Sequence, residues 1–393
     1  MLERKIRIGV DAREFVGTTT GIARLFKGLL EPLLSLRPGW DFIFYGNSKT
    51  VFPFRSDNSR FIRLKEPLTP WWDQISVVRS LRQEKARLFL SPYYKVPLFA
   101  PCPVIHIVHD LIPLTNQSYR SIRYLIPRLA LYVFGRLYTH KAQVTLTDSF
   151  YTRGILLKKF RLSDKKVHVV YPGIESRFSP PTGDHPFEQI AMKYRIQKPY
   201  LLYVGNFKPH KRVDYLVQAF RKLPEGIRKT TQLVLAGRRT PETKVLDRLV
   251  ERLDLQNQVV FTGFVSEEDL PLLYGGAALF VFPSSDEGFG LPPLEAMACG
   301  VPVIASGVAS LLEILGKAAI LVEPGNAERL CGEMERLLRD PQERERRIRM
   351  GREHVKQFSI QSQCQAFLSI LDNVLAGTQR EDVLEGSGQD STH

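Results

Sequence analysis

Residues 284–303 have the sequence SSDEGFGLPPLEAMACGVPV and follow an apolar run, ALFVFP, that is typical of a buried strand. Glycines and prolines stand between two glutamates, Glu287 and Glu295. Proline fixes φ near the start of a helix, so the stretch predicts a sharp turn from a strand into a helix. Taken alone, such a turn needs no function, because its glutamates can face water.

The chemistry of this turn nevertheless suits a ligand. Its glycines leave neighbouring amides uncovered, and the N–H groups of Phe289, Gly290 and Leu291 can donate to hydroxyl or phosphate oxygens. Ionised carboxylates only accept hydrogen bonds, so Glu287 and Glu295 suit the paired hydroxyls of a sugar. One glutamate precedes the turn and the other lies in the first turns of the helix. We therefore expect them to contact different parts of one ligand.

Length and periodicity predict two α/β domains. The 393 residues are 44% hydrophobic and 24% charged, which is the composition of a globular protein, and the length favours two cores. Short apolar runs alternate with amphipathic segments on both sides of a Pro- and Gly-rich stretch at 172–186, which predicts two parallel sheets. We expect domains over 1–180 and 181–357, a closing helix over 358–376 and a disordered tail over 377–393.

Other features restrict the compartment and the partners. No run approaches the roughly 20 apolar residues of a membrane span, and the first residues lack the pattern of a secretory signal. The four cysteines show no metal-ligand spacing, so we expect buried thiols, a cytoplasmic protein and no metal site.

The charge is one-sided. Residues 1–190 hold 29 Lys and Arg against 15 Asp and Glu, whereas residues 191–393 hold 26 of each. This favours an anionic partner for the first half, although a solvated basic surface explains it as well. No nucleic-acid-binding motif accompanies the charge. The segment YRSIRYLIPRLALYVFGRLYTHK at 119–141 suits a lipid-diphosphate acceptor at an anionic membrane, or else an ordinary helix whose apolar stripe lies in the core.

Two more loops follow predicted strands. Gly17 and Gly21 flank a threonine run that predicts either a plain turn or a phosphate cradle. Lys208, Lys211 and Arg212 cluster just before a helix, where cations oppose the helix dipole unless an anion lies among them. A diphosphate fits that position, and Lys211 is the expected contact.

These segments together resemble glycosyltransferase family 4, and particularly its bacterial mannosyltransferase-like branch. The resemblance rests on YVGNFKPHKRVDYLVQAF, VVFTGF and the two-glutamate motif in the second half, and on HDLIPL and VHVVYPG in the first. It implies two Rossmann-like domains facing across a cleft, the GT-B arrangement, with the last helix closing back on the first domain. The first domain would lie on the acceptor side, and the second would bind the nucleotide-sugar donor.

The resemblance also implies a retaining hexosyltransferase without cofactor or metal. The implied catalytic residues are His109, Lys211 and Glu287, and the implied donor-binding residues are Gly21, Asn206, Lys211, Val265, Glu287, Gly288, Phe289, Gly290, Leu291 and Glu295.

Each implied residue has a role by this resemblance. Glu295 would hold the ribose, while Glu287 and the amides that follow it would hold the donor sugar and the phosphate. Lys211, with Asn206, would neutralise the diphosphate, and the backbone of Val265 would lie beside the base.

In the first domain, His109 would reach the sugar and Gly21 would face the phosphate. The sequence departs from the family at three places, one of which is Lys317, a surface change where aspartate is common. Asn206 stands where arginine is common, and Ile360 stands where tryptophan is common near the closing helix.

The expected function is transfer of a sugar, with mannose from GDP-mannose preferred, to a glycan or lipid-diphosphate acceptor in cell-surface polysaccharide synthesis. The enzyme would work in the cytoplasm or peripherally on the inner face of the membrane. The alternatives are a nucleotide-sugar epimerase, a disaccharide synthase with a soluble acceptor, and a catalytically silent sugar-nucleotide-binding scaffold.

Overall fold

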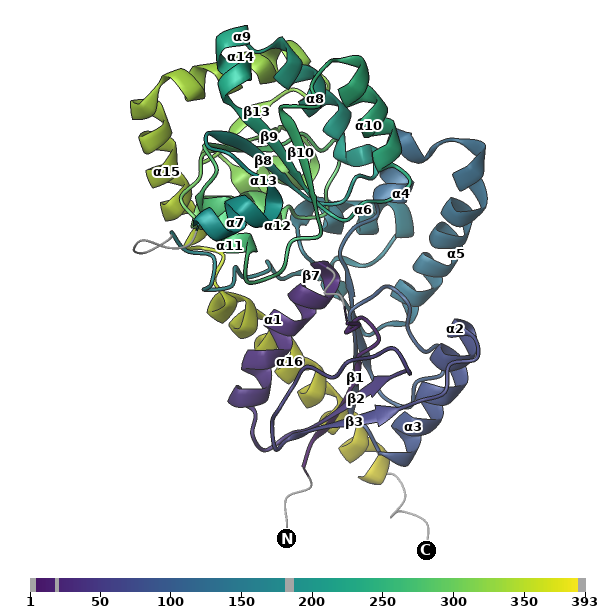
Figure 1. Cartoon of the computed structure of the whole chain (residues 1–393). Helices are drawn as coiled ribbons and strands as arrows, with labels where there is room; N and C mark the ends of the chain where they lie inside the picture. Colours follow the sequence, from purple (N-terminus) through teal and green to yellow (C-terminus); the bar gives the residue numbers. More distant parts are fainter. Residues whose placement is uncertain (1–4, 18–20, 181–186, 388–393) are drawn as a thin grey trace, which may run out of the picture. The chain divides into compact units, whose positions relative to one another are not determined.

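The computed structural model describes residues 5–17, 21–180 and 187–387. The chain forms two compact units: unit 1 comprises residues 1–114, 122–173 and 360–393, and unit 2 comprises residues 115–121 and 174–359. Each unit contains one parallel sheet with helices packed on it (Figure 1). The prediction of two α/β domains with parallel sheets is confirmed.

Unit 1 is built on a seven-stranded sheet with the order β3-β2-β1-β4-β5-β6-β7. Its central strands are buried along their whole length because helices cover both faces of a parallel sheet, which explains their continuous apolar runs. The strands are β1 (Arg7–Asp11), β2 (Asp41–Gly46), β3 (Ser59–Arg63), β4 (Leu88–Ser91), β5 (Val104–Val108), β6 (Val144–Thr147) and β7 (Val167–Val169).

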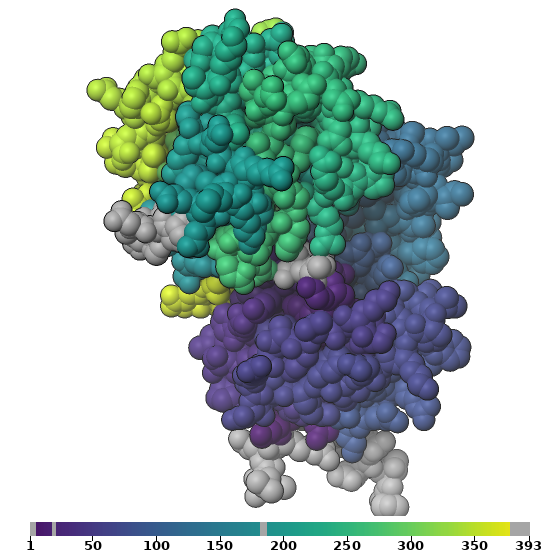
Figure 2. Space-filling view, in the orientation of Figure 1, coloured from purple at the N-terminus to yellow at the C-terminus, as the bar shows by residue number. Residues whose placement is uncertain are grey.

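The helices of unit 1 fall on opposite faces of this sheet. Figure 1 shows α1 and α16 on one side of β1–β3 and α3 on the other, and side chains close over the sheet in Figure 2. The helical segments are α1 (Gly21–Leu36), α2 (Thr69–Trp71), the π-helix η1 (Trp72–Ser76), α3 (Val77–Gln83), α4 (Ile112–Thr115), η3 (Ile122–Tyr124), α5 (Leu125–Lys141), α6 (Phe150–Phe160), η4 (Asp164–Lys166) and α16 (Ile360–Ser387); Thr115 itself is assigned to unit 2.

The last helix belongs to unit 1 although the chain reaches it from unit 2. Phe367, Leu371 and Leu375 of α16 are buried in the same apolar cluster as Phe26 and Leu30 of α1. Burial of these side chains explains why the helix returns to the first sheet. The prediction that the final helix closes back on the first domain is therefore confirmed.

Unit 2 contains a six-stranded sheet with the order β10-β9-β8-β11-β12-β13. Its strands are β8 (Tyr200–Val204), β9 (Gln232–Ala236), β10 (Val259–Gly263), β11 (Leu279–Phe282), β12 (Val303–Ser306) and β13 (Ile320–Val322). Its helical segments are η2 (Gln117–Tyr119), α7 (Phe187–Tyr194), η5 (Pro209–Lys211), α8 (Val213–Lys222), α9 (Glu225–Thr230), α10 (Thr243–Arg252), α11 (Leu270–Gly275), α12 (Leu291–Ala298), α13 (Ala309–Leu315), α14 (Ala327–Arg339) and α15 (Pro341–Val355).

The boundaries differ from those expected. The chain enters unit 2 at Ile174, not at 181, because the Ile174 N–H donates to the Phe358 carbonyl over 2.8 Å. Arg177 then pairs with Glu267 at 3.0 Å in the same unit. The final helix begins at Ile360 and continues to Ser387, whereas we expected it over 358–376 with a disordered tail from 377. Residues 388–393 of that tail and residues 181–186 of the expected linker lie outside the described residues.

Candidate functional site

The structure places nine of the eleven predicted site residues in unit 2, and most of them lie on or just after the loops that follow its central strands β8 and β11. β8 pairs directly with β11, so the loops after these two strands leave the same edge of the sheet side by side. Parallel sheets bind ligands at this edge. The first loop carries Asn206 and Lys211, and the second carries Glu287 and the glycine turn that leads into α12.

Lys211 and Glu287 form an ion pair between these two loops. The Lys211 Nζ donates to the Glu287 Oε1 over 2.6 Å, and the side chains are only 12% and 9% exposed. The ammonium also lies 5.2 Å from the centre of the Phe282 ring at the end of β11. A cation held in such dry surroundings attracts an anion more strongly than it would in water, because the local dielectric constant is low.

The loop after β8 is held close to the loop after β9. The Gly205 N–H donates to the Ala236 carbonyl over 2.9 Å, and a Cβ on Gly237 would lie 1.9 Å from the Gly205 oxygen. The Tyr203 hydroxyl donates to the Asn206 carbonyl over 2.6 Å. Burial raises the pKa of Tyr203 well above its ordinary value, with a contribution from Glu287, so the phenol stays protonated as a donor. The Asn206 side chain itself is exposed.

The glycine turn before α12 is fixed from behind. The Ser310 hydroxyl donates to the carbonyls of Glu287 and Phe289 over 2.9 and 3.2 Å. Gly290 has φ 104°, and a Cβ there would lie 2.5 Å from Leu311, so only glycine fits. Leu291 begins α12, which confirms the predicted turn from a strand into a helix and places its first amides after Glu287.

Glu295 lies on α12 and is 1% exposed. The Tyr274 hydroxyl of α11 donates to its Oε2 over 2.8 Å. Tyr274 also packs edge-on against Phe178, with ring centres 5.9 Å apart. The sequence pattern did not reveal Tyr274, because its neighbours predict only an amphipathic helix.

The remaining predicted residues of unit 2 follow two different strands, β10 and β11. Val265 is half-buried just after β10, which ends at Gly263. Gly288 and Phe289 are buried in the turn, and Leu291 is half-buried. All of these positions follow strands of the same parallel sheet, and their contact with a single ligand stays a prediction.

A short segment from the first half of the chain, residues 115–121, packs on the same loops. The Thr115 hydroxyl donates to the Asp286 carboxylate over 2.6 Å, and the Asn116 amide donates to the Ser285 hydroxyl over 3.0 Å. The Tyr119 hydroxyl lies 2.8 Å from the His210 Nδ1. This segment therefore belongs to unit 2, although the sequence predicted it as part of the first domain.

The side chain of His210, next to Lys211, is neutral, and its backbone helps to hold the loop after β8 in place. Burial, with the charges of Lys211 and Lys208, lowers its pKa to about 3. Its carbonyl accepts from the Ser285 N–H over 2.7 Å. A backbone hydrogen bond thus joins the loop after β8 to the loop after β11. The Lys211–Glu287 ion pair joins the same two loops.

The other two predicted residues, His109 and Gly21, lie in unit 1. Gly21 is exposed at the first residue of α1, where an added Cβ would meet nothing within 4 Å. His109 follows β5, and its Nδ1 lies 2.6 Å from the Asp148 carboxylate while its Nε2 lies 3.1 Å from the Pro92 carbonyl. Both ring nitrogens therefore contact acceptors of the protein itself.

The surroundings of His109 favour its charged form. Burial is the largest single influence and lowers its pKa, but the charge and hydrogen bond of Asp148, with Asp110 and the Pro92 carbonyl, outweigh it. The net pKa lies above the ordinary value. A protonated ring donates from both nitrogens, which matches its two acceptors.

Replacing Asp148 with asparagine should lower the pKa of His109, because burial is then opposed only by the charge of Asp110 and the Pro92 carbonyl. The stability that His109 contributes at acidic pH should decrease too. In the wild type the raised pKa stabilises the fold at acidic pH, and that stability is lost as the pH rises through the folded-state pKa. NMR titration of the histidine rings, assigned with His109→Gln, measures the shift.

The matched control for this titration is Asp164→Asn. Asp164 pairs with Arg153 at 2.6 Å and is 77% exposed, so its loss should leave His109 unchanged. An unchanged pKa of His109 in Asp148→Asn would contradict the ion pair.

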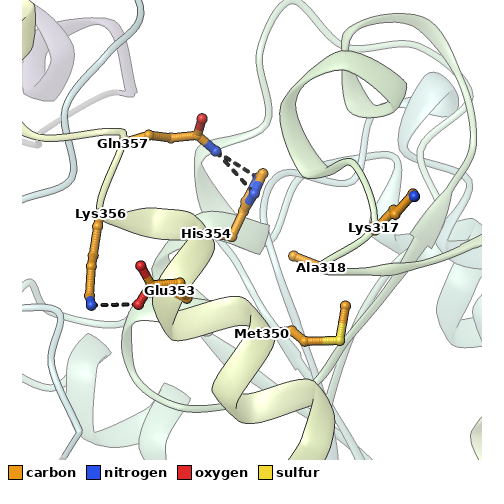
Figure 3. Close-up of a pocket in the computed structure, with 7 residues that line it drawn as sticks. All are labelled: Lys317, Ala318, Met350, Glu353, His354, Lys356 and Gln357. Atoms are coloured by element: carbon orange, nitrogen blue, oxygen red, sulfur yellow. Dashed lines mark hydrogen bonds and ion pairs between the residues drawn. The ribbon is translucent and has the colours of Figure 1, made fainter.

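A surface hollow of about 650 Å³ lies elsewhere on unit 2. Figure 3 shows its lining, in which the Gln357 amide points at the His354 ring and Lys356 pairs with Glu353 beside α15. None of the predicted site residues lines it. We therefore assign the candidate site to the loops after β8 and β11 and not to this hollow.

Comparison with known proteins tests the resemblance seen in the sequence. The family model described as Glycosyltransferase Family 4 matches residues 42–178, and the model described as Glycosyl transferases group 1 matches residues 187–354. The chain belongs to glycosyltransferase family 4. In this family-4 chain the group 1 match lies within unit 2, which carries nine of the predicted site residues.

Curated relatives of this family-4 chain include two mannosyltransferases of Escherichia coli. The O-antigen chain mannosyltransferase B is 36% identical over 221 residues, which cover 56% of this chain and 57% of that protein. The serotype-specific mannosyltransferase WbdA is 31% identical over 248 residues, which cover 61% of this chain and 30% of that protein. The chain thus matches just over half of one relative's length and less than a third of the other's.

A solved structure shares the fold. Sucrose-phosphate synthase from Thermosynechococcus elongatus aligns over 95% of this chain and 100% of its own, with a TM-score of 0.77 and 22% identity. At this identity the likeness concerns the fold of the family-4 chain alone.

Proposed function

We propose that this chain is a retaining hexosyltransferase that moves mannose from GDP-mannose to a glycan or lipid-linked saccharide in cell-surface polysaccharide synthesis. The observation that carries the proposal is the Lys211–Glu287 pair, which joins two sheet-edge loops at 2.6 Å with little exposure. A cation, a carboxylate and the first amides of α12 in one place supply complementary groups for a sugar diphosphate.

The proposed reaction uses these groups in different ways. The bond between the anomeric carbon and the diphosphate oxygen breaks, and the acceptor hydroxyl oxygen forms the new bond on the same face of the sugar. The acceptor proton passes to a diphosphate oxygen. Lys211 and the amides before α12 would stabilise the negative charge that develops on the diphosphate, which is worth a few kcal/mol for each preorganised donor.

Glu287 would then serve two purposes. Its carboxylate holds the Lys211 ammonium at 2.6 Å in the structure. It would also face the positive charge that develops on the sugar, as an orienting and stabilising group and not as a covalent nucleophile. Ser310 fixes the backbone on which it stands. His109 of unit 1 would contact the donor sugar and Gly21 the phosphate.

Glu295 is proposed to accept hydrogen bonds from the ribose hydroxyls, with Val265 beside the base. Tyr274 orients its carboxylate. Because Glu295 is 1% exposed, the ribose would reach it only after the neighbouring side chains move. No cofactor or divalent metal is proposed, since Lys211 and the amides would neutralise the diphosphate.

Mannose is favoured as the donor sugar because the two relatives described above are named mannosyltransferases. An O-antigen relative also favours a cell-surface glycan as the acceptor. If the acceptor of this cell-surface glycan is linked to a lipid, it lies at the membrane. The protein would then work in the cytoplasm, peripherally on the inner face of the membrane.

A panel of nucleotide sugars tests this proposal. We expect GDP-mannose to raise the melting temperature more than UDP-glucose, UDP-galactose or dTDP-sugars, and to release GDP slowly without acceptor and in the presence of EDTA. A larger rise of the melting temperature with another nucleotide sugar would overturn the assignment of GDP-mannose as the donor. Binding without release or transfer to any acceptor would instead support a silent sugar-nucleotide-binding scaffold.

A further inference from the structure

Helix α5 of unit 1 exposes an unusual apolar surface. Of the 19 large hydrophobic side chains that are exposed in the described residues, eight lie between residues 122 and 137. Ile122 of η3 and then Ile126, Leu129, Val133 and Leu137 of α5 follow one another at helical spacing, with exposures of 89%, 79%, 61%, 50% and 46%. This is the stripe that a core-facing helix would bury.

The opposite side of α5 already anchors the helix. Gly135 and Thr139 are its buried residues, and a Cβ on Gly135 would lie 3.2 Å from the Phe160 ring of α6. The Arg136 Nε donates to the Phe160 carbonyl over 3.2 Å, and the His140 Nε2 lies 2.8 Å from the same oxygen. The apolar stripe is therefore not needed to hold α5 on unit 1.

The charge of this segment of the chain has one sign. The 37 residues from 111 to 147 contain five Lys and Arg and no Asp or Glu. Arg123, in η3 just before α5, and Lys141, the last residue of α5, are exposed. A basic surface with an apolar centre matches a helix that lies in the headgroup layer of an anionic bilayer.

We propose that the exposed stripe of α5, with the basic residues beside it, docks unit 1 on an anionic lipid bilayer. The helix would lie in the plane of the headgroups, and in the described part of the chain no helix is long and apolar enough to cross a membrane. A second copy of this chain fits the face less well, because a two-fold contact would bring the same basic face against itself. Figure 2 shows residues of this region, in steel blue, at the molecular surface.

This inference deepens the proposed function, on which it rests for its biological setting, because a lipid-linked acceptor lies at such a surface. The docking itself requires no donor and no catalysis. The two proposals can therefore fail separately.

Vesicle flotation of the full chain tests the docking. We expect binding to vesicles of phosphatidylcholine with phosphatidylglycerol, much weaker binding to phosphatidylcholine alone, and a loss of binding as salt screens the lipid charge. Leu129→Gln with Val133→Gln should weaken binding by about tenfold or more, because two exposed apolar side chains no longer enter the interface. Arg123→Gln with Lys141→Gln should weaken it to a similar extent.

The matched control is Val245→Gln with Leu312→Gln, which removes two apolar side chains of unit 2 that are 67% and 55% exposed. It should bind vesicles as the wild type does. Equal binding by the α5 variants and the wild type, or no binding of the wild type to anionic vesicles, would overturn the proposal. So would a dimer in sedimentation that Leu129→Gln with Val133→Gln dissociates. GDP-mannose binding in the same preparations reports separately on the proposed function.

Discussion

Replacing Lys211 with alanine is expected to lower the rate of donor cleavage by about 10²–10³-fold, the effect of losing one preorganised donor at a developing negative charge. The ammonium is 12% exposed and bound to Glu287, so water cannot replace it readily. Release of GDP from GDP-mannose under single-turnover conditions measures the rate.

Loss of Lys211 also leaves the Glu287 carboxylate nearly buried and unpaired with its cation, which destabilises a fold by about 3–5 kcal/mol. The double variant Lys211→Ala with Glu287→Gln separates the two effects. It should recover most of the melting temperature, because neither charge remains, while the rate stays as low as in Lys211→Ala.

The matched control is Lys222→Ala. Lys222 is also a lysine of unit 2 that pairs with a glutamate, Glu328, but its side chain is 44% exposed. Exposed ion pairs contribute little to the stability of a fold, so the melting temperature should remain near that of the wild type. Lys222 is not among the proposed site residues, so the rate should also remain near that of the wild type. A Lys211→Ala enzyme that folds and retains its rate would contradict the assigned role.

Gly237→Ala should destabilise unit 2 by about 3 kcal/mol, at the upper end of overpacking effects. Its Cβ would lie 1.9 Å from the Gly205 carbonyl oxygen, and a backbone atom cannot rotate away as a side chain does. Gly205 begins the loop that carries Lys211. The strain should therefore weaken GDP-mannose binding as well, although neither glycine carries a reactive group.

Thermal unfolding and donor titration of Gly237→Ala measure both effects. Gly226→Ala in α9 is the control, since an added Cβ there meets nothing within 4 Å. That substitution should be neutral or slightly stabilising, because alanine favours helix. Equal stability of the two alanine variants would show that the loops after β8 and β9 are not held as closely as the structure indicates.

Local patterns made much of the fold predictable from the sequence. Continuous apolar runs became buried parallel strands, and the glycines and prolines after β11 became the turn into α12. The loop positions of Lys211 and Glu287 followed from the same patterns. Each of these features depends on neighbouring residues alone, which is why one sequence sufficed.

Pairs that depend on strand order could not be predicted. Lys211 meets Glu287 because β8 pairs with β11, although two strands lie between them in the sequence. His109 meets Asp148 because β5 pairs with β6. The position of Asp148 directly after β6 is the feature of the sequence from which this contact could have been found. The packing of residues 115–121 on the loops after β8 and β11 depends on side-chain contacts that no local periodicity encodes.

Isothermal titration of GDP tests the central claim most directly, because it requires neither the acceptor nor the membrane. The account predicts binding of one GDP per chain, a large loss of affinity in Lys211→Ala and Glu295→Ala, and unchanged affinity in Lys222→Ala. GDP binding that survives in both Lys211→Ala and Glu295→Ala would contradict the assignment of the site to these loops. No binding of GDP or of any other nucleoside diphosphate to the wild type would contradict a nucleotide-sugar site altogether.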